Sequence, residues 1–85
     1  MSAIICKYSQ DFVIADWVVN GANSEIIVTG LTHCRGIYPI VQVFQLVSGE
    51  YRVVYPLEID VNPTTGTVTI AVLTANVFDG RVLIL

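Results

Sequence analysis

The chain has 85 residues and a net charge of −3, and 54% of its residues are hydrophobic while only 13% are charged. This length allows one domain, over residues 1–85, and its small interior cannot easily hide so many apolar side chains. The few basic residues are scattered singly, which excludes a nucleic-acid-binding surface, and no segment reaches the roughly 20 unbroken apolar residues of a membrane-spanning helix. We therefore expect the surplus apolar surface to contact other protein.

The first half of the chain alternates between apolar segments and turn-forming residues. Valine, isoleucine and threonine supply 31 of the 85 residues, and these β-branched types favour strands over helices. A polar segment over residues 7–11 separates the first two apolar runs, and a loop is expected over residues 31–37. The strands expected in this half cover residues 3–6, 12–19, 25–29 and 38–47.

The second half carries the clearest strand pattern. Residues 50–61 alternate between an apolar face and a solvent-facing side, and Pro56 predicts either two strands joined near it or one bent edge strand. Tight turns are expected at residues 48–49, 62–66 and 79–80. The other strands expected here are 67–73, with one face buried, and 81–85, covered on both faces; residues 74–78 could form one short helical turn.

This spacing of strands and turns predicts an all-β fold. About seven strands, separated by turns every eight to twelve residues, are typical of a small antiparallel β-sandwich. No internal repeat, linker or low-complexity segment interrupts the pattern. We therefore expect a single sandwich domain.

The chain lacks the residue patterns of an enzyme. Its one histidine, His33, directly precedes Cys34, and neighbours on an extended segment point to opposite faces, so a Cys/His pair is not favoured. A backbone hydrogen bond is the expected role for His33. Acidic residues such as Asp11 and Asp16 are expected to face solvent, and the isolated glycines form no phosphate loop. We expect no catalysis and no cofactor.

The two cysteines, Cys6 and Cys34, could pair or remain as free thiols. Because the N-terminal residues lack a secretion-signal pattern, two buried free thiols are favoured over a disulfide. Cys6, Cys34 and His33 do not have the paired spacing of a metal site, so no metal is expected.

Four residues are candidates for an interface or a binding surface. Trp17 and Phe12 are expected to face opposite sheet surfaces, with one of them exposed, although a core position is favoured for Trp17. Exposed tyrosines could provide a stacking platform, and an apolar residue on the solvent-facing side of residues 50–61 could join an interface. The candidates are Tyr8, Trp17, Tyr38 and Val54.

One segment resembles a pattern in small β-sandwich modules of bacteriophage tail-fibre, head-fibre and decoration-type virion proteins. In those modules a turn of the type Ile-Thr-His-Asn-Leu-Gly precedes a strand that reads like Val-Gln-Val-Tyr. Cys34 and Arg35 depart from the usual Asn-Leu pair. The resemblance covers roughly residues 25–85 and leaves residues 1–24 outside it. The matching residues are Thr32, His33, Gly36, Pro39, Val41, Gln42, Val43 and Phe44.

The resemblance implies a structural virion protein that is assembled in the host cytoplasm. Its partners would be further copies of the same chain and other virion proteins, and it would act as a capsid decoration, head-fibre or tail-appendage subunit. The alternative is a β-sandwich module that binds a host glycan or receptor, with Trp17, Tyr38 or Tyr8 as the stacking platform. Both hypotheses place aromatic and apolar residues on the surface, so the sequence leaves both open.

Overall fold

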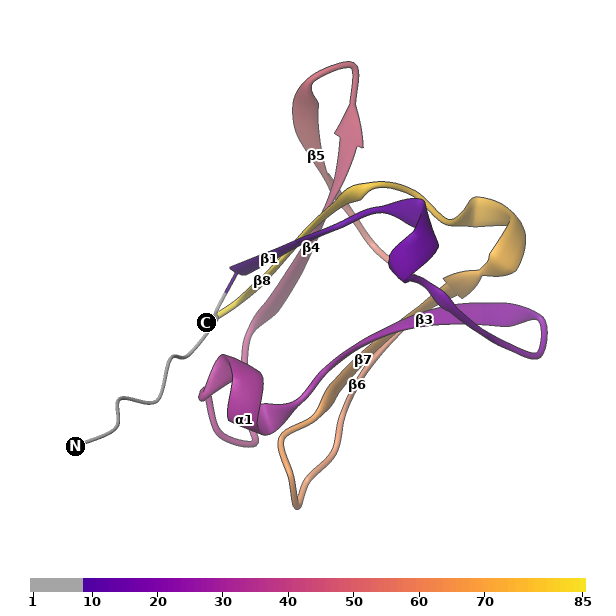
Figure 1. Cartoon of the computed structure of the whole chain (residues 1–85). Coiled ribbons are helices and arrows are strands. Elements are labelled where there is room, and N and C mark those ends of the chain that lie inside the picture. Colours follow the sequence, from indigo (N-terminus) through magenta and orange to yellow (C-terminus); the bar gives the residue numbers. More distant parts are fainter. Residues whose placement is uncertain (1–8) are drawn as a thin grey trace.

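The computed structural model describes residues 9–85 and shows two antiparallel four-stranded sheets packed face to face (Figure 1). The predicted all-β sandwich is therefore confirmed, with eight strands in the described range rather than about seven. The first sheet has the order β1 (Ser9–Phe12), β8 (Gly80–Ile84), β4 (Val41–Val47) and β5 (Glu50–Val54). The second has the order β2 (Val18–Asn20), β3 (Asn23–Val28), β7 (Val68–Leu73) and β6 (Glu58–Val61).

The core lies between the two sheets and follows from the alternation of the central strands. In β7, Val68 and Ile70 are fully buried, as the predicted strand over residues 67–73 requires. Val82 and Ile84 of β8 face them from the first sheet. The outward-facing residues of β8 are only half-buried, so the expectation that the last strand is covered on both faces is wrong for its outer face.

The N-terminal part differs from the predicted strand over residues 12–19. The first strand, β1, begins within the segment expected to be a polar separator, and a single 3-10 turn, η1 (Ile14–Asp16), then leads into β2 in the other sheet. The Asp16 carboxylate accepts the amide hydrogen of Val13 at 2.9 Å and holds this turn. Hydrophobic composition alone did not reveal the turn. The strand expected over residues 3–6 lies outside the described residues.

The turn at residues 14–16 also corrects the expected placement of the two nearby aromatic residues. Phe12 and Trp17 are both buried, and their rings meet edge to face with centroids 5.3 Å apart. The prediction that they face opposite surfaces assumed a continuous strand between them. The core position that was favoured for Trp17 is confirmed, and its indole N–H donates to the Phe78 carbonyl at 2.8 Å.

Two of the three tight turns predicted in the second half agree with the structure, whereas residues 79–80 form no turn because Gly80 already begins β8. Ser48 and Gly49 both have positive φ and close the hairpin between β4 and β5. Gly66, at φ 76°, completes the turn between β6 and β7, and its amide donates to the Asn62 carbonyl at 2.9 Å. The short helical turn expected near residue 74 is η2 (Thr74–Asn76), whereas α1 (Gly30–His33) replaces part of a predicted loop.

The alternating segment over residues 50–61 divides at Pro56 into strands of different sheets. This confirms the prediction of two strands joined near Pro56, rather than one bent edge strand. Because Val54 pairs with buried Val43, it faces inward, while Tyr51 and Val53 face outward. The expectation that Val54 lies on the solvent-facing side is therefore wrong for β5, since one apolar face cannot continue through a change of sheet.

Candidate functional site

An open groove lies between the two sheets, on the side where β5 leaves the first sheet and β6 enters the second. Its volume is 570 Å³, within the range of small-molecule binding sites. The sheet change at Pro56 creates this opening, because the chain crosses from one sheet to the other there instead of closing the gap with a strand. The groove is lined by Gln45, Val54, Tyr55, Pro56, Leu57, Val72, Leu73, Asn76, Val77 and Phe78.

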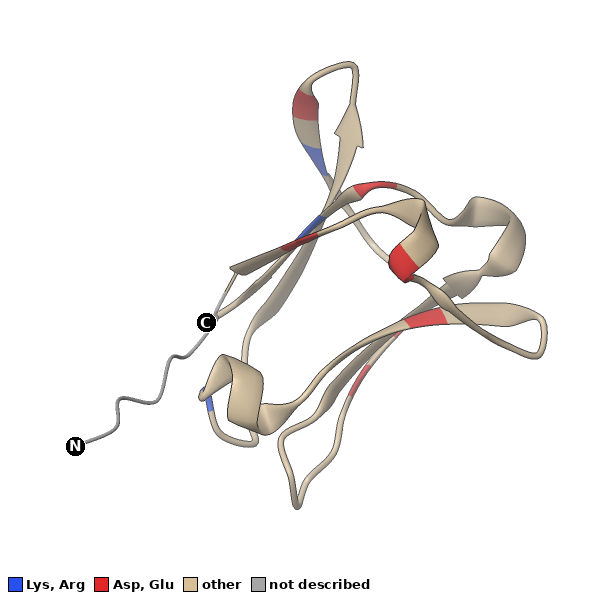
Figure 2. Ribbon diagram, in the orientation of Figure 1, with Lys and Arg blue, Asp and Glu red and all other residues tan. Residues whose placement is uncertain are grey.

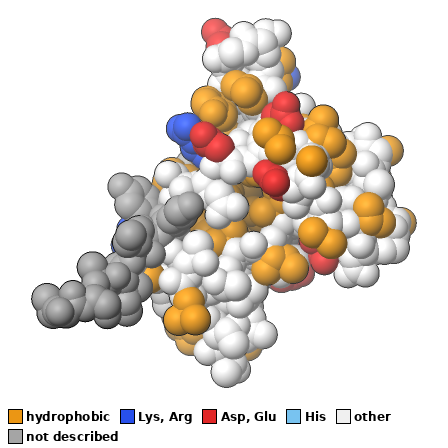
Figure 3. Space-filling model, viewed as in Figure 1, with side chains coloured by type: hydrophobic (Ala, Val, Ile, Leu, Met, Phe, Trp, Pro, Cys, Tyr) orange, Lys and Arg blue, Asp and Glu red, His pale blue; other side chains and the backbone are white. Residues whose placement is uncertain are grey.

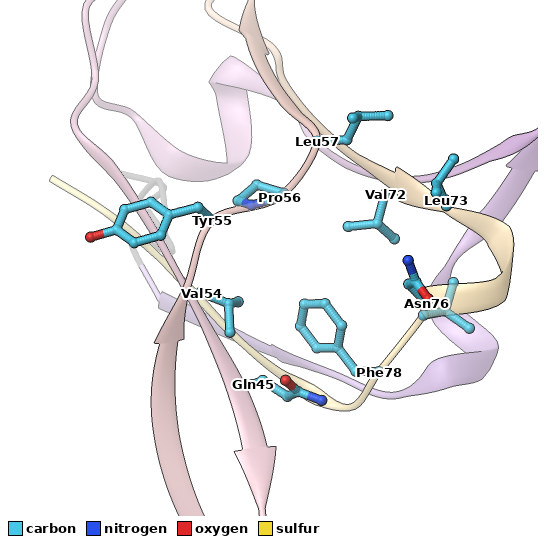
Figure 4. A pocket seen from close by; sticks show the side chains of 10 residues that line it. Gln45, Val54, Tyr55, Pro56, Leu57, Val72, Leu73, Asn76 and Phe78 are labelled. Carbon is cyan, nitrogen blue, oxygen red and sulfur yellow. The ribbon is translucent and has the colours of Figure 1, made fainter.

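The groove has an apolar floor and a rim that is largely open to solvent. Figure 4 shows Val54, Val72 and Phe78 pointing into the hollow, with the amides of Asn76 and Gln45 beside them. The Tyr55 ring lies at the rim and points away from the hollow (Figure 4), and this residue is 93% exposed. Among the described residues, this arrangement offers an apolar surface with two neutral side-chain amides and no charged side chain.

Phe78 is fixed from behind by the aromatic part of the core. Its ring centroid lies 5.4 Å from that of Trp17 and 5.7 Å from that of Phe12. Such tilted and edge-to-face pairs add stability beyond the burial of apolar area. The groove floor is therefore held in place by the packing of residues that cannot themselves contact a ligand.

A second surface feature is the outer face of the first sheet. Arg81 donates from Nε to Asp11 Oδ1 at 2.6 Å, and its guanidinium lies 4.6 Å from the centroid of the Tyr51 ring. The hydrogen bond from Arg81 lowers the pKa of the Asp11 carboxyl, and the same bond raises the pKa of Arg81. Phe44 lies beside Tyr51 in an edge-to-face contact with centroids 6.4 Å apart.

His33 has the structural role that its sequence context favoured. It is fully buried, and its Nδ1 accepts the amide hydrogen of Arg35 at 2.8 Å. Its Nε2 lies 2.6 Å from the Gly66 carbonyl oxygen, so Nε2 carries the proton and donates. The Nε2 bond links α1 to the turn between β6 and β7, while the Nδ1 bond holds the backbone that directly follows α1.

Cys34 takes part in a disulfide. The expectation of two free buried thiols is therefore wrong for Cys34, which is also exposed. Cys6 lies outside the described residues.

The four candidate residues from the sequence do not form one site. Trp17 is in the core, so its ring cannot serve as a stacking platform, whereas Tyr38 is 90% exposed in the segment between α1 and β4. Val54 lines the groove, and Tyr8 lies outside the described residues. The sequence did not indicate Gln45, Asn76 or Phe78, because they come from distant segments that only the sheet topology brings together.

The charged residues between positions 9 and 85 do not gather into a polar site. Figure 2 shows acidic residues on both sheets, whereas the basic residues of the described range lie on the first sheet and in the loop after α1. Within residues 9–85, no group of three or more histidine, cysteine, aspartate or glutamate side chains could hold a metal ion. None of the helices in this part of the chain is long and apolar enough to cross a membrane.

No family model, curated protein or solved structure matches this chain. The resemblance of residues 25–85 to bacteriophage appendage modules therefore stays a prediction based on short sequence motifs.

Proposed function

We propose that this chain is a structural subunit of a bacteriophage virion, acting as a capsid decoration, head-fibre or tail-appendage protein through the packing of several copies. The observation that carries the proposal is the amount of apolar surface left open. Seventeen large hydrophobic side chains are exposed among the described residues, whereas ten form the buried core cluster. Figure 3 shows hydrophobic side chains reaching the surface over several parts of one face.

Part of this surface is continuous. On the outer face of the hairpin formed by β4 and β5, Phe44 lies opposite Val53 and Leu46 lies opposite Tyr51, so two apolar cross-strand pairs are adjacent. Such a face on a small soluble domain is typical of a contact between proteins. The short sequence motifs in residues 31–44 favour a virion as the setting of that contact.

The proposal is tested on the purified full-length chain and on virions. Sedimentation velocity over about a hundredfold range of concentration should show an oligomer that dissociates on dilution. Mass spectrometry of purified particles of the encoding phage should detect several copies of the chain per virion. A chain that is monomeric at every concentration and missing from the particles would rule the proposal out.

The groove favours a second candidate, a module that binds a host glycan. Its volume of 570 Å³, the fixed Phe78 ring and the amides of Gln45 and Asn76 suit a sugar ring, which presents an apolar face and hydroxyl groups. A glycan array with the purified chain tests this candidate directly. Asn76→Ala should weaken glycan binding, whereas Tyr38→Ala, which lies outside the groove, should leave it unchanged. If only Tyr38→Ala weakens binding, the glycan binds at Tyr38 and not in the groove.

A further inference from the structure

The strand β5 has one free backbone edge. It is the last strand of the first sheet and, within residues 9–85, pairs only with β4. Because the two-residue turn at Ser48 and Gly49 closes the hairpin, Val47 and Glu50 form a hydrogen-bonded pair. The backbone groups of Tyr51 and Val53 then point away from β4. In agreement, the amide of Leu46, opposite Tyr51, donates to the Asp79 carbonyl at 2.8 Å.

The charges along β5 match those of a second β5 strand that runs antiparallel to it. Glu50 and Arg52 project from the same side of the strand, two positions apart. When Tyr51 of one copy lies opposite Tyr51 of the other, each Glu50 lies directly opposite Arg52 of the second copy. These two pairs are of the non-hydrogen-bonded type, in which opposing side chains lie closest. The two tyrosines exchange their backbone hydrogen bonds.

Apolar contacts and the position of the hairpin support the same alignment. Tyr51 and Val53 are each 43% exposed on the outer face, and a strand added beside them would cover part of both side chains. Figure 1 shows the end of the β4–β5 hairpin extending beyond the rest of the sandwich, away from the second sheet.

The other edge strands do not offer this match. The same alignment of two β6 strands would place Glu58 opposite Asp60, and like charges directly opposite each other destabilise a pair. The strand β2 has only three residues and no charged side chain. The acidic residue of β1, Asp11, is already paired with Arg81.

We propose that β5 pairs with β5 of a second copy about a two-fold axis at Tyr51, which joins the first sheets of two chains into one eight-stranded sheet. The inference rests on the proposed assembly of several copies and names the strand through which two of them join. A two-fold contact of this kind uses the same patch on both chains.

A charge-reversal series on the full-length chain tests the pairing by sedimentation equilibrium. Arg52→Glu and Glu50→Arg should each raise the dimer dissociation constant by about tenfold or more, because two attractive pairs become repulsive. The double variant Glu50→Arg/Arg52→Glu should restore dimerisation, since the opposite charges face each other again. Glu58→Arg, on the edge strand of the other sheet, is the matched control and should leave the constant unchanged.

A further variant examines the backbone edge. Val53→Pro removes an amide that points away from β4, so it should prevent dimerisation while circular dichroism shows a retained β-fold. If the wild-type chain forms an oligomer whose dissociation constant is unchanged in the charge-reversal variants and in Val53→Pro, the β5 pairing is wrong. The copies would then assemble through another surface. A wild-type chain that is monomeric throughout would overturn both the pairing and the assembly of this chain with itself.

Discussion

At the level of single residues, His33 joins two segments that are far apart in the sequence. Its imidazole accepts from the Arg35 amide and donates to the Gly66 carbonyl, and the side chain is fully buried. We predict that His33→Ala lowers the free energy of unfolding by about 2–4 kcal/mol, because it removes two hydrogen bonds and leaves a cavity in place of a buried ring. Urea denaturation measures this loss. Leu31→Ala, on the same short helix and 88% exposed, is the control and should change little. Equal midpoints for both variants would contradict the linking role.

The Asp11–Arg81 pair predicts a pH dependence of stability. Because the hydrogen bond from Arg81 holds the pKa of Asp11 below its ordinary value of 3.8, the pair stabilises the fold at neutral pH. That contribution is lost as the pH falls through the lowered pKa and the carboxyl takes up a proton. In Arg81→Gln, the pKa of Asp11 measured by NMR should rise toward its ordinary value. Arg52→Gln, on the opposite face of the sheet, should leave it unchanged. An Asp11 pKa that is the same in wild type and Arg81→Gln would refute the coupling.

At the level of elements, Gly80 allows β8 to lie close to its neighbour β4. A Cβ atom at this position would lie 1.9 Å from the Phe44 carbonyl oxygen and 3.0 Å from the Phe12 ring. We predict that Gly80→Ala costs about 2 kcal/mol or more, because backbone and core would both have to move. Thermal unfolding followed by circular dichroism measures the cost. Gly21→Ala, where a Cβ meets nothing within 4 Å but φ is +66°, should cost only about 1 kcal/mol. A smaller loss at Gly80 than at Gly21 would speak against close packing at β8.

The elements also show what the sequence could predict. Period-two alternation found β7 and β6, and turn chemistry placed the hairpins at Gly49 and Gly66, because these signals are local. Alternation could not reveal that the chain changes sheets at residues 14–16 and at Pro56, since that depends on contacts with distant strands. For this reason Val54 was assigned to the wrong face, and the groove, whose walls come from three separate segments, was not predicted.

At the level of the whole molecule, assembly should make thermal stability depend on protein concentration. If native dimers unfold to separate chains, mass action raises the melting midpoint by about 4 °C for each tenfold increase in concentration of a domain this size. Differential scanning calorimetry over about a hundredfold range measures the shift, with coincident repeat scans as the control for reversibility. Arg52→Glu should remove most of the shift, because the proposed β5 contact then brings like charges together. A midpoint that stays constant over the whole range would show that the exposed apolar surface does not hold copies of this chain together.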